Sequence, residues 1–129
     1  MVIDSSALIA ILQDEPEAQL MIEAIQADPN RRLSAANLLE TSIVIEARKG
    51  PAGGRELSLL LHRGKVEIVN LTGELSEAAL AAWRTWGKGN HPAGLNYCDC
   101  CAYALAHHLG EKLLFKGGDF SKTDIKAAR

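Results

Sequence analysis

The sequence predicts an α/β protein, a three-layer sandwich in which a central parallel sheet of four or five strands is flanked by helices. Short apolar segments alternate along the chain with longer segments whose apolar residues recur at helical spacing. Strands that alternate with helices indicate a parallel sheet covered on both faces. The length of 129 residues is typical of one domain, so we expect a single domain over residues 1–129.

The first half of the chain predicts two strands, each followed by helices. Ala7, Leu8 and Ile11 fall on one face of the segment after the first strand, and Gly50-Pro51 is a pair that ends a helix. The expected elements are a buried strand at 1–4, a helix at 5–13, a helix with Pro16 in its first turn, a strand at 32–36 and a helix at 37–49.

The second half of the chain repeats this alternation. Gly64 and Gly110 stop two of its helices, and three glycines with one proline make residues 87–94 a loop. The expected elements are a helix from Gly53-Gly54 to Arg63, a strand at 66–69, a helix at 74–86, a helix at 96–109, a strand at 112–115 and a short polar tail from Lys116.

Charge and composition exclude several classes of protein. Lys and Arg number 14 against 16 Asp and Glu, so the net charge is −2 and no overall basic field favours nucleic acid. The chain does not open with a secretory signal pattern, and no apolar run approaches the ~18 residues that span a bilayer. Cys98, Cys100 and Cys101 are odd in number and clustered, unlike a disulfide framework. We therefore expect a cytoplasmic protein with reduced thiols.

Four acidic residues occupy positions where a parallel sheet gathers ligands. Asp4 ends the first expected strand, and Asp119 follows the fourth. Glu40 and Asp99 lie in the first turns of two expected helices. Strand ends and the helix starts that follow them meet at the carboxyl edge of an open parallel sheet. We therefore expect the four acids to converge at this edge.

The structural interpretation of these acids is helix capping or a turn. An acid at the third helical position can bond back to the cap residue and complete a capping box. The roles would be Asp4 as an N-cap, Asn37-x-x-Glu40 and Asn96-x-x-Asp99 as capping boxes, and Asp119 as a turn residue. Capping does not require all four acids to lie at one edge, so their common placement favours a functional site.

Four carboxylates in one cleft repel one another and raise one another's pKa values. A hard divalent cation removes that repulsion, and an oxygen-only donor set without His favours Mg²⁺ or Mn²⁺ over Zn²⁺. Such an ion can hold and polarise a phosphate, so the natural chemistry is phosphodiester hydrolysis.

The other cysteine, aromatic and basic motifs are weaker signals. Cys98-x-x-Cys101 lacks a second pair of metal ligands and falls in an apolar helix, so packing is preferred over a metal or redox site. Trp83 and Trp86 lie on an amphipathic helix, where core or dimer packing is favoured over base stacking. Lys116, just after the last expected strand, is the best basic candidate for contacting a substrate phosphate.

Four stretches in a fixed order resemble the PIN-domain family, and its VapC-like toxin branch in particular. They span nearly the whole chain and are Met1-Val2-Ile3-Asp4-Ser5-Ser6-Ala7, Ala36-Asn37-Leu38-Leu39-Glu40, Leu95-Asn96-Tyr97-Cys98-Asp99-Cys100 with Ala104-Leu105-Ala106, and Leu114-Phe115-Lys116-Gly117-Gly118-Asp119-Phe120 with Thr123-Asp124-Ile125. Each stretch alone is a weak signal, whereas four in this order and spacing are specific. The chain departs from the family at Cys98, where relatives often have Gly.

The resemblance implies a PIN-like sheet between helices and a Mg²⁺-dependent endoribonuclease, with Mn²⁺ as a substitute, that cleaves tRNA, rRNA or mRNA. Such an enzyme is the toxin of a toxin–antitoxin pair and is held inactive by a VapB-like antitoxin. Together with the apolar helices, the resemblance predicts a homodimer. Carried onto this sequence, it makes Asp4 and Asp99 the metal ligands, and Glu40 and Asp119 complete the catalytic acids. Ser6 matches a hydroxyl that supports the site.

Two alternatives stay open at this point. Asp124 matches a recurrent acid of the family's tail and is either part of the site or structural. The whole chain could instead be a catalytically weak PIN-like module that binds RNA or protein, with acids that serve only as helix caps. Cleavage of RNA in the presence of added metal separates the enzyme from the binding module.

Overall fold

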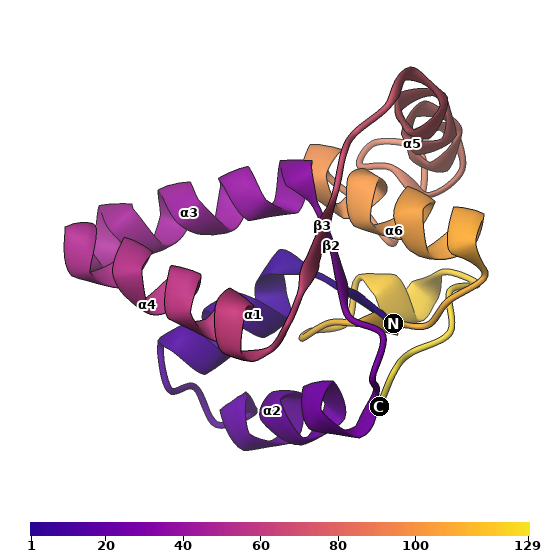
Figure 1. The fold of residues 1–129 in the computed structure, drawn as a ribbon. Coiled ribbons are helices and arrows are strands. Elements are labelled where there is room, and N and C mark those ends of the chain that lie inside the picture. Colours follow the sequence, from indigo (N-terminus) through magenta and orange to yellow (C-terminus); the bar gives the residue numbers. More distant parts are fainter.

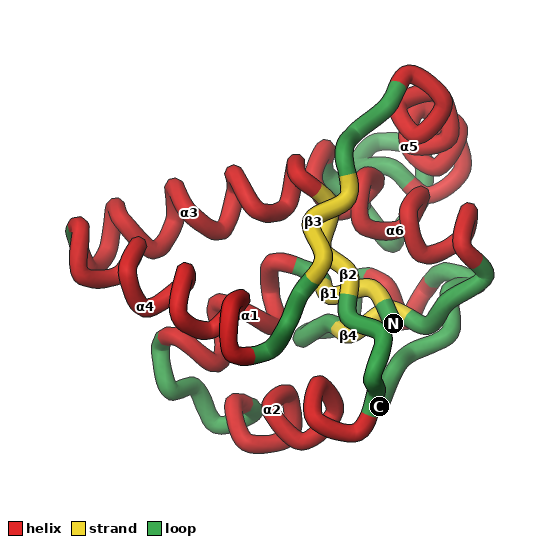
Figure 2. Tube along the Cα trace, in the orientation of Figure 1, coloured by secondary structure: helices red, strands yellow, loops and turns green.

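A computed structural model describes residues 1–129 and contains a four-stranded sheet in the order β3-β2-β1-β4, with helices on both faces (Figure 1). In chain order the elements are β1 (Val2–Ile3), α1 (Ser5–Leu12), α2 (Ala18–Ala27), β2 (Arg32–Ser34), α3 (Ala35–Lys49), α4 (Pro51–Arg63), β3 (Glu67–Val69), α5 (Gly73–Trp86), α6 (Tyr97–Leu109), β4 (Leu113–Leu114) and a 3-10 turn, η1 (Phe120–Lys122). Figure 2 shows the short strands side by side at the centre, with the helices around them. No helix combines the length and the apolar character needed to cross a bilayer.

Every pair of neighbouring strands in the sheet is parallel. Val2 pairs with Arg32 on one side and with Leu113 on the other, so β1 lies in the interior of the sheet. These pairings confirm the predicted α/β class and the parallel sheet. Beyond β4 the sheet continues only as a single parallel bridge between Leu113 and Ala127, so the structure has four strands.

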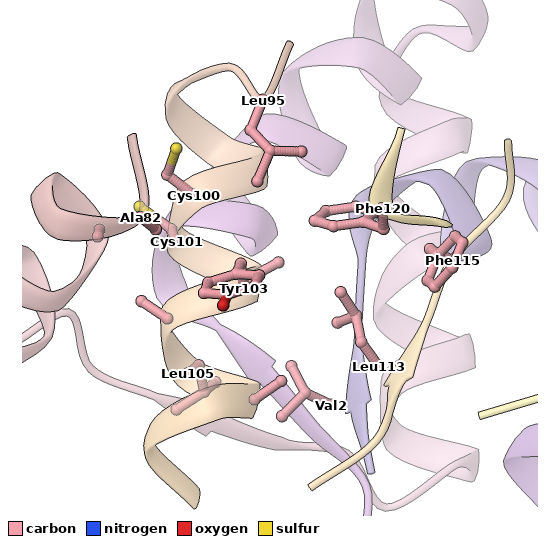
Figure 3. Packing of buried hydrophobic residues seen from close by; sticks show 14 of the residues in the cluster. Val2, Ala82, Leu95, Cys100, Cys101, Tyr103, Leu105, Leu113, Phe115 and Phe120 are labelled. Atoms are coloured by element: carbon pink, nitrogen blue, oxygen red, sulfur yellow. The ribbon is translucent and has the colours of Figure 1, made fainter. Parts of the chain in front are cut away.

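Alternation along the short strands divides the apolar core into two layers. Val2 and Leu113 pack against α5 and α6, whereas Ile3 and Leu114 pack against α1 and α2. Successive side chains of a strand point to opposite faces of the sheet, so the two residues of β1 and the two of β4 contribute to both layers. Figure 3 shows the first layer, in which Leu105 of α6 lies in the same cluster as Val2.

Side-chain caps fix where the helices begin. An N-cap oxygen accepts a hydrogen bond from a backbone N–H of the first turn, which satisfies a group that the helix itself leaves unpaired. The caps are Asp4 for α1, Ser34 for α3, Thr72 for α5 and Asn96 for α6. Two of them directly follow or end a strand, so α1 and α3 both start at the carboxyl edge of the sheet.

The start of α3 differs from the prediction. The helix expected at 37–49 begins at Ala35, because the Ser34 hydroxyl and not the Asn37 side chain caps it. Glu40 is therefore the sixth residue of the helix and lies in its second turn. The proposed capping box between Asn37 and Glu40 is wrong, and both side chains are available for other contacts.

Two other helix boundaries also differ from the prediction. Pro16 lies in the turn before α2 and not in its first helical turn. Pro51 begins α4, so Gly53 and Gly54 lie inside that helix and do not lead into it. Gly53 allows α4 to approach α3 closely, since a Cβ there would stand 2.6 Å from the side chain of Ile45.

Candidate active site

The four predicted acids come together at the carboxyl edge of the sheet. Asp4 follows the last residue of β1, Asp119 lies in the segment after β4, and Glu40 lies on the helix that follows β2. Asp99 reaches the edge from the first turn of α6. The charges of Asp99 and Glu40 act on Asp4, and those of Glu40 and Asp119 act on Asp99. The structure therefore brings Asp4, Glu40 and Asp99 to one edge and places Asp119 within electrostatic reach of Asp99.

The carboxylate of Asp4 is buried and is hydrogen-bonded mainly through one of its two oxygens. Its side chain Oδ2 accepts from the backbone N–H of Ser6 at 3.0 Å and from the Ser6 hydroxyl at 2.6 Å. Oδ1 accepts only from the Asn37 amide, at 3.4 Å. The capping interpretation of Asp4 is thus correct, and Oδ1 still has lone pairs available to bind a cation.

Asp99 follows the same pattern at the start of α6. Its Oδ2 accepts from the Asn96 N–H at 3.0 Å, and the Asn96 side chain accepts from the Asp99 N–H at 2.9 Å. This reciprocal pair is the predicted capping box. As in Asp4, the cap uses a single carboxylate oxygen, so capping and ligand binding do not exclude one another.

Glu40 and Cys98 face each other across the gap between α3 and α6. Burial raises the pKa of the Cys98 thiol to about 12, and the negative charge of Glu40 and a hydrogen bond to it add to that rise. A thiol held in this way stays protonated. Cys100 and Cys101 are buried in the core, as the packing interpretation predicts, whereas Cys98 is half-exposed at the acidic edge.

Ser6 connects Asp4 to the segment after β4. Its hydroxyl donates to Asp4 and accepts from the Lys116 backbone N–H at 3.0 Å. The Lys116 ammonium is instead paired with Glu15 at 2.7 Å and stands 3.6 Å from Glu17. Lys116 therefore supports the site through its backbone, while its side chain is engaged by two acids that compete with any phosphate. Asp119 lies three residues further on and is exposed.

Burial and mutual repulsion make ionisation at this edge unfavourable. Burial raises the pKa of Asp4 to about 7, hydrogen bonds from Ser6 oppose the rise, and the charges of Asp99 and Glu40 add to it. Burial also raises the pKa of Asp99, against the hydrogen bond from the Asn96 backbone. The edge consequently holds carboxylates that a nearby cation would stabilise.

Carboxylate oxygens at this edge suit a divalent cation. The salt bridges of the protein include none of the four acids, so their charge has no cationic partner. No three His, Cys, Asp or Glu side chains lie close enough together to hold one ion. Mg²⁺ keeps several waters and needs only one or two carboxylates, so an edge without three clustered ligands still suits it. Zn²⁺, which takes three or four protein ligands, fits less well.

Asn37 and Asp124 have contacts that the sequence alone did not reveal. Asn37 is fully buried beneath the acids instead of capping a helix. A Ser three positions ahead of it was the only sign that the helix starts earlier. Asp124 accepts a hydrogen bond from the Tyr103 hydroxyl, which ties the C-terminal segment to α6. This contact gives Asp124 a structural role.

Comparison with known proteins assigns the family. The PIN domain family matches residues 1–126. The chain belongs to the PIN-domain family. Ribonuclease VapC30 of Mycobacterium tuberculosis is 56% identical over 125 residues, which cover 97% of this chain and 95% of that protein. Ribonuclease VapC of Mycolicibacterium smegmatis is 55% identical over 127 residues, which cover 98% of each chain. Within the family, the chain therefore belongs with the VapC ribonucleases, as its resemblance predicted.

Solved structures share the fold at low sequence identity. VapC20 of Mycobacterium tuberculosis, described as a sarcin-ricin loop cleaving toxin, matches with a TM-score of 0.78 and 17% identity over 96% of this chain and 95% of that chain. A toxin–antitoxin complex from Klebsiella pneumoniae contains a chain with a TM-score of 0.72 and 18% identity, over 95% and 92% of the two chains. These likenesses confirm the predicted PIN-like arrangement of sheet and helices.

Replacing Asp4 by Asn should stabilise the metal-free protein at alkaline pH. Folding raises the Asp4 pKa from 3.8 to about 7, so the native state binds this proton more tightly than the unfolded chain does. The resulting stability is full below pH 4 and is lost as the pH rises through 7, by up to about 4 kcal/mol. In EDTA, Asp4→Asn should melt several degrees above wild type at pH 8, a difference that narrows toward pH 4. A variant that melts below wild type at both ends of this range would contradict the burial argument.

Proposed function

We propose that this protein is a Mg²⁺-dependent endoribonuclease and the toxin of a VapBC-like toxin–antitoxin pair, with Asp4, Glu40, Asp99 and Asp119 as its catalytic acids. The observation that carries the proposal is the Asp4 carboxylate, which is buried at the carboxyl edge beside other acids and has no cationic partner. The chain belongs with the VapC ribonucleases, and a cation held at such an edge can promote hydrolysis of a phosphodiester.

Asp4 and Asp99 would hold the ion, and Mn²⁺ would substitute for Mg²⁺. A divalent ion bound there supplies the positive charge that polarises the scissile phosphate. Glu40 and Asp119 contribute carboxylates that can orient the attacking water and accept its proton. Ser6 holds the Asp4 carboxylate in place, and the Lys116 backbone holds Ser6.

The proposed substrate is tRNA, rRNA or mRNA. A protein of the same fold, VapC20, is described as cleaving the sarcin-ricin loop. We expect the enzyme to recognise single-stranded loops of the RNA, because the bases of such loops are exposed. The net charge of −2 gives little general attraction for a polyanion, so binding depends on the cation and on local basic side chains. Contacts of this kind weaken as salt concentration rises.

A VapB-like antitoxin is the proposed inhibitor of this activity, and the cytoplasm is the proposed compartment for both partners and the RNA. The support comes from chains of the same fold in a toxin–antitoxin complex of Klebsiella pneumoniae and in VapBC2 of Rickettsia felis.

A homodimer is proposed from the apolar surface of α3, α5 and α6. Large side chains are exposed here by 43% to 73%, and the two hollows between them share Leu71 and Tyr97, so the surface is continuous. These exposed side chains, which we name the apolar face, are Leu39, Ile43, Leu80, Trp83 and Tyr97. An exposed apolar patch of this kind marks an interaction site, and a second copy can cover it by a two-fold contact.

A charge in the apolar face should break the dimer. Ile43→Glu is expected to sediment as a monomer at a concentration at which wild type sediments as a dimer, because a carboxylate would be buried without a partner. Leu20→Glu is the matched control, since Leu20 is similarly exposed but lies on α2 outside the apolar face. A wild-type monomer, or a dimer that survives the Ile43 substitution, would rule out this surface.

Removing one ligand should abolish cleavage without unfolding the protein. Asn at position 99 can still accept the Asn96 N–H, so Asp99→Asn keeps the cap bond. Loss of residues that only support metal ligands lowers activity about 10–100-fold, so loss of a ligand should exceed about 100-fold. Glu46→Gln, exposed on α3, is the control and should keep the wild-type rate.

The measurement is cleavage of tRNA and rRNA, followed on gels with Mg²⁺, with EDTA, and with Mn²⁺ added after EDTA. Chelation should stop cleavage and Mn²⁺ should restore it. Wild-type protein that binds these RNAs and leaves them intact with either ion would favour the non-catalytic binding module. Cleavage by Asp99→Asn at the wild-type rate would show that the ligand assignment is wrong.

A further inference from the structure

The side chain of Asn37 lies directly beneath the acidic edge, at the meeting point of three elements. Its amide nitrogen is 3.0 Å from the Ser5 hydroxyl, 3.3 Å from the Cys98 carbonyl oxygen and 3.4 Å from Asp4 Oδ1. These acceptors belong to the start of α1, to the first turn of α6 and to the residue that follows β1. A single amide group thus touches every segment that supplies an acid except the one after β4.

Attachment of α3 to α1 does not depend on this amide alone. The Ser5 hydroxyl donates to the Asn37 backbone carbonyl at 3.2 Å, and the Thr41 hydroxyl donates to the same carbonyl at 2.7 Å. Both of these bonds use the Asn37 backbone and survive a change of its side chain. The side-chain amide therefore adds contacts that bear chiefly on Asp4 and on the residue next to Asp99.

The amide contact with Asp4 falls on the oxygen that capping leaves free. Ser6 occupies Oδ2 twice, so the Asn37 amide is the remaining hydrogen-bond donor that can fix the direction of Oδ1. Through the Cys98 carbonyl, the same amide fixes the peptide that leads into Asp99. Glu40 lies three positions further along α3, on the same side of the helix as Asn37.

The other end of the amide argues against a purely structural role. Asn37 Oδ1 is buried and has no hydrogen-bond partner. A buried unpaired oxygen destabilises the folded state, so a side chain retained only for packing would do better without it. The amide nitrogen shares its two N–H groups among three acceptors and is the part that the site uses.

We propose that Asn37 is a positioning residue that sets the spacing of the Asp4, Glu40 and Asp99 carboxylates, and with it the affinity of this edge for a divalent cation. The inference rests on the proposed function, since it assumes that Asp4 and Asp99 bind the ion. Groups that orient metal ligands typically change metal affinity or activity by 10–100-fold when they are lost.

The test measures Mn²⁺ binding directly, from the spectrum of free Mn²⁺ in an electron paramagnetic resonance titration, together with the melting temperature of each variant. Asn37→Ala should raise the Mn²⁺ dissociation constant by about 10–100-fold. Thr41→Val is the matched control. Thr41 is equally buried, one turn along the same helix, and donates to the Asn37 backbone carbonyl, but it makes no hydrogen bond with Asp4 or Cys98. The Mn²⁺ dissociation constant of Thr41→Val should stay within about twofold of wild type, even if its melting temperature falls as far as that of Asn37→Ala.

The outcomes separate this inference from the function on which it rests. Wild-type affinity in Asn37→Ala, alongside lost binding in Asp99→Asn, would overturn the role of Asn37 and leave the metal site standing. Equal losses of affinity in Asn37→Ala and Thr41→Val would also overturn it, since a general loss of stability in α3 would then explain both. Wild-type protein that binds no Mn²⁺ would overturn the metal site and this inference together. If Asn37→Ala does not fold, Asn37→Ser, which keeps a small polar side chain, is measured against the same control.

Discussion

The buried carboxylate of Asp4 is the constraint on which the rest of the site depends. The strand β1 lies inside the sheet, so Asp4, which follows it, is enclosed by neighbouring elements and is almost without solvent contact. Burial and the charges of Asp99 and Glu40 raise its pKa to about 7, and the bonds from Ser6 offset only part of that rise. A sequence selected for stability alone would place a neutral side chain here. The carboxylate destabilises the metal-free protein and makes the same position favourable for a cation, a common trade-off at functional sites.

Helix capping and cation binding are compatible because they use different oxygens of the same carboxylates. Asp4 and Asp99 both cap a helix through Oδ2, and the cap fixes the side chain's orientation. The N-terminal ends of α1 and α6 also favour negative charge at the places where the two carboxylates lie. Secondary structure at the end of the strands therefore holds two acids near each other in spite of their repulsion. The fold and the site share one set of hydrogen bonds.

The meeting of the four acids could be predicted because it follows from chain order and the geometry of parallel sheets. Asp4 ends one strand and Asp119 follows another, and neither fact needs knowledge of packing. The role of Asn37 could not be predicted in this way, since Ser34 and Asn37 are both good cap residues and nothing local decides between them. The ion pair between Lys116 and Glu15 could not be predicted either, because Glu15 is 101 positions away in the chain. Sequence patterns predict which residues lie at the carboxyl edge of the sheet. Contacts between segments that are distant in the sequence determine the direction of their side chains.

Release of protons on metal binding tests the central claim most directly. A carboxyl with a pKa of about 7 is half protonated at pH 7, and a cation that it binds must displace that proton. Titration calorimetry with Mg²⁺ in two buffers of different ionisation enthalpy measures the number of protons released. The account predicts that Asp4 releases about half a proton per ion at pH 7 and that this release falls toward zero by pH 9. Binding of Mg²⁺ without proton release at pH 7, or with a release that does not fall as the pH rises, would contradict it.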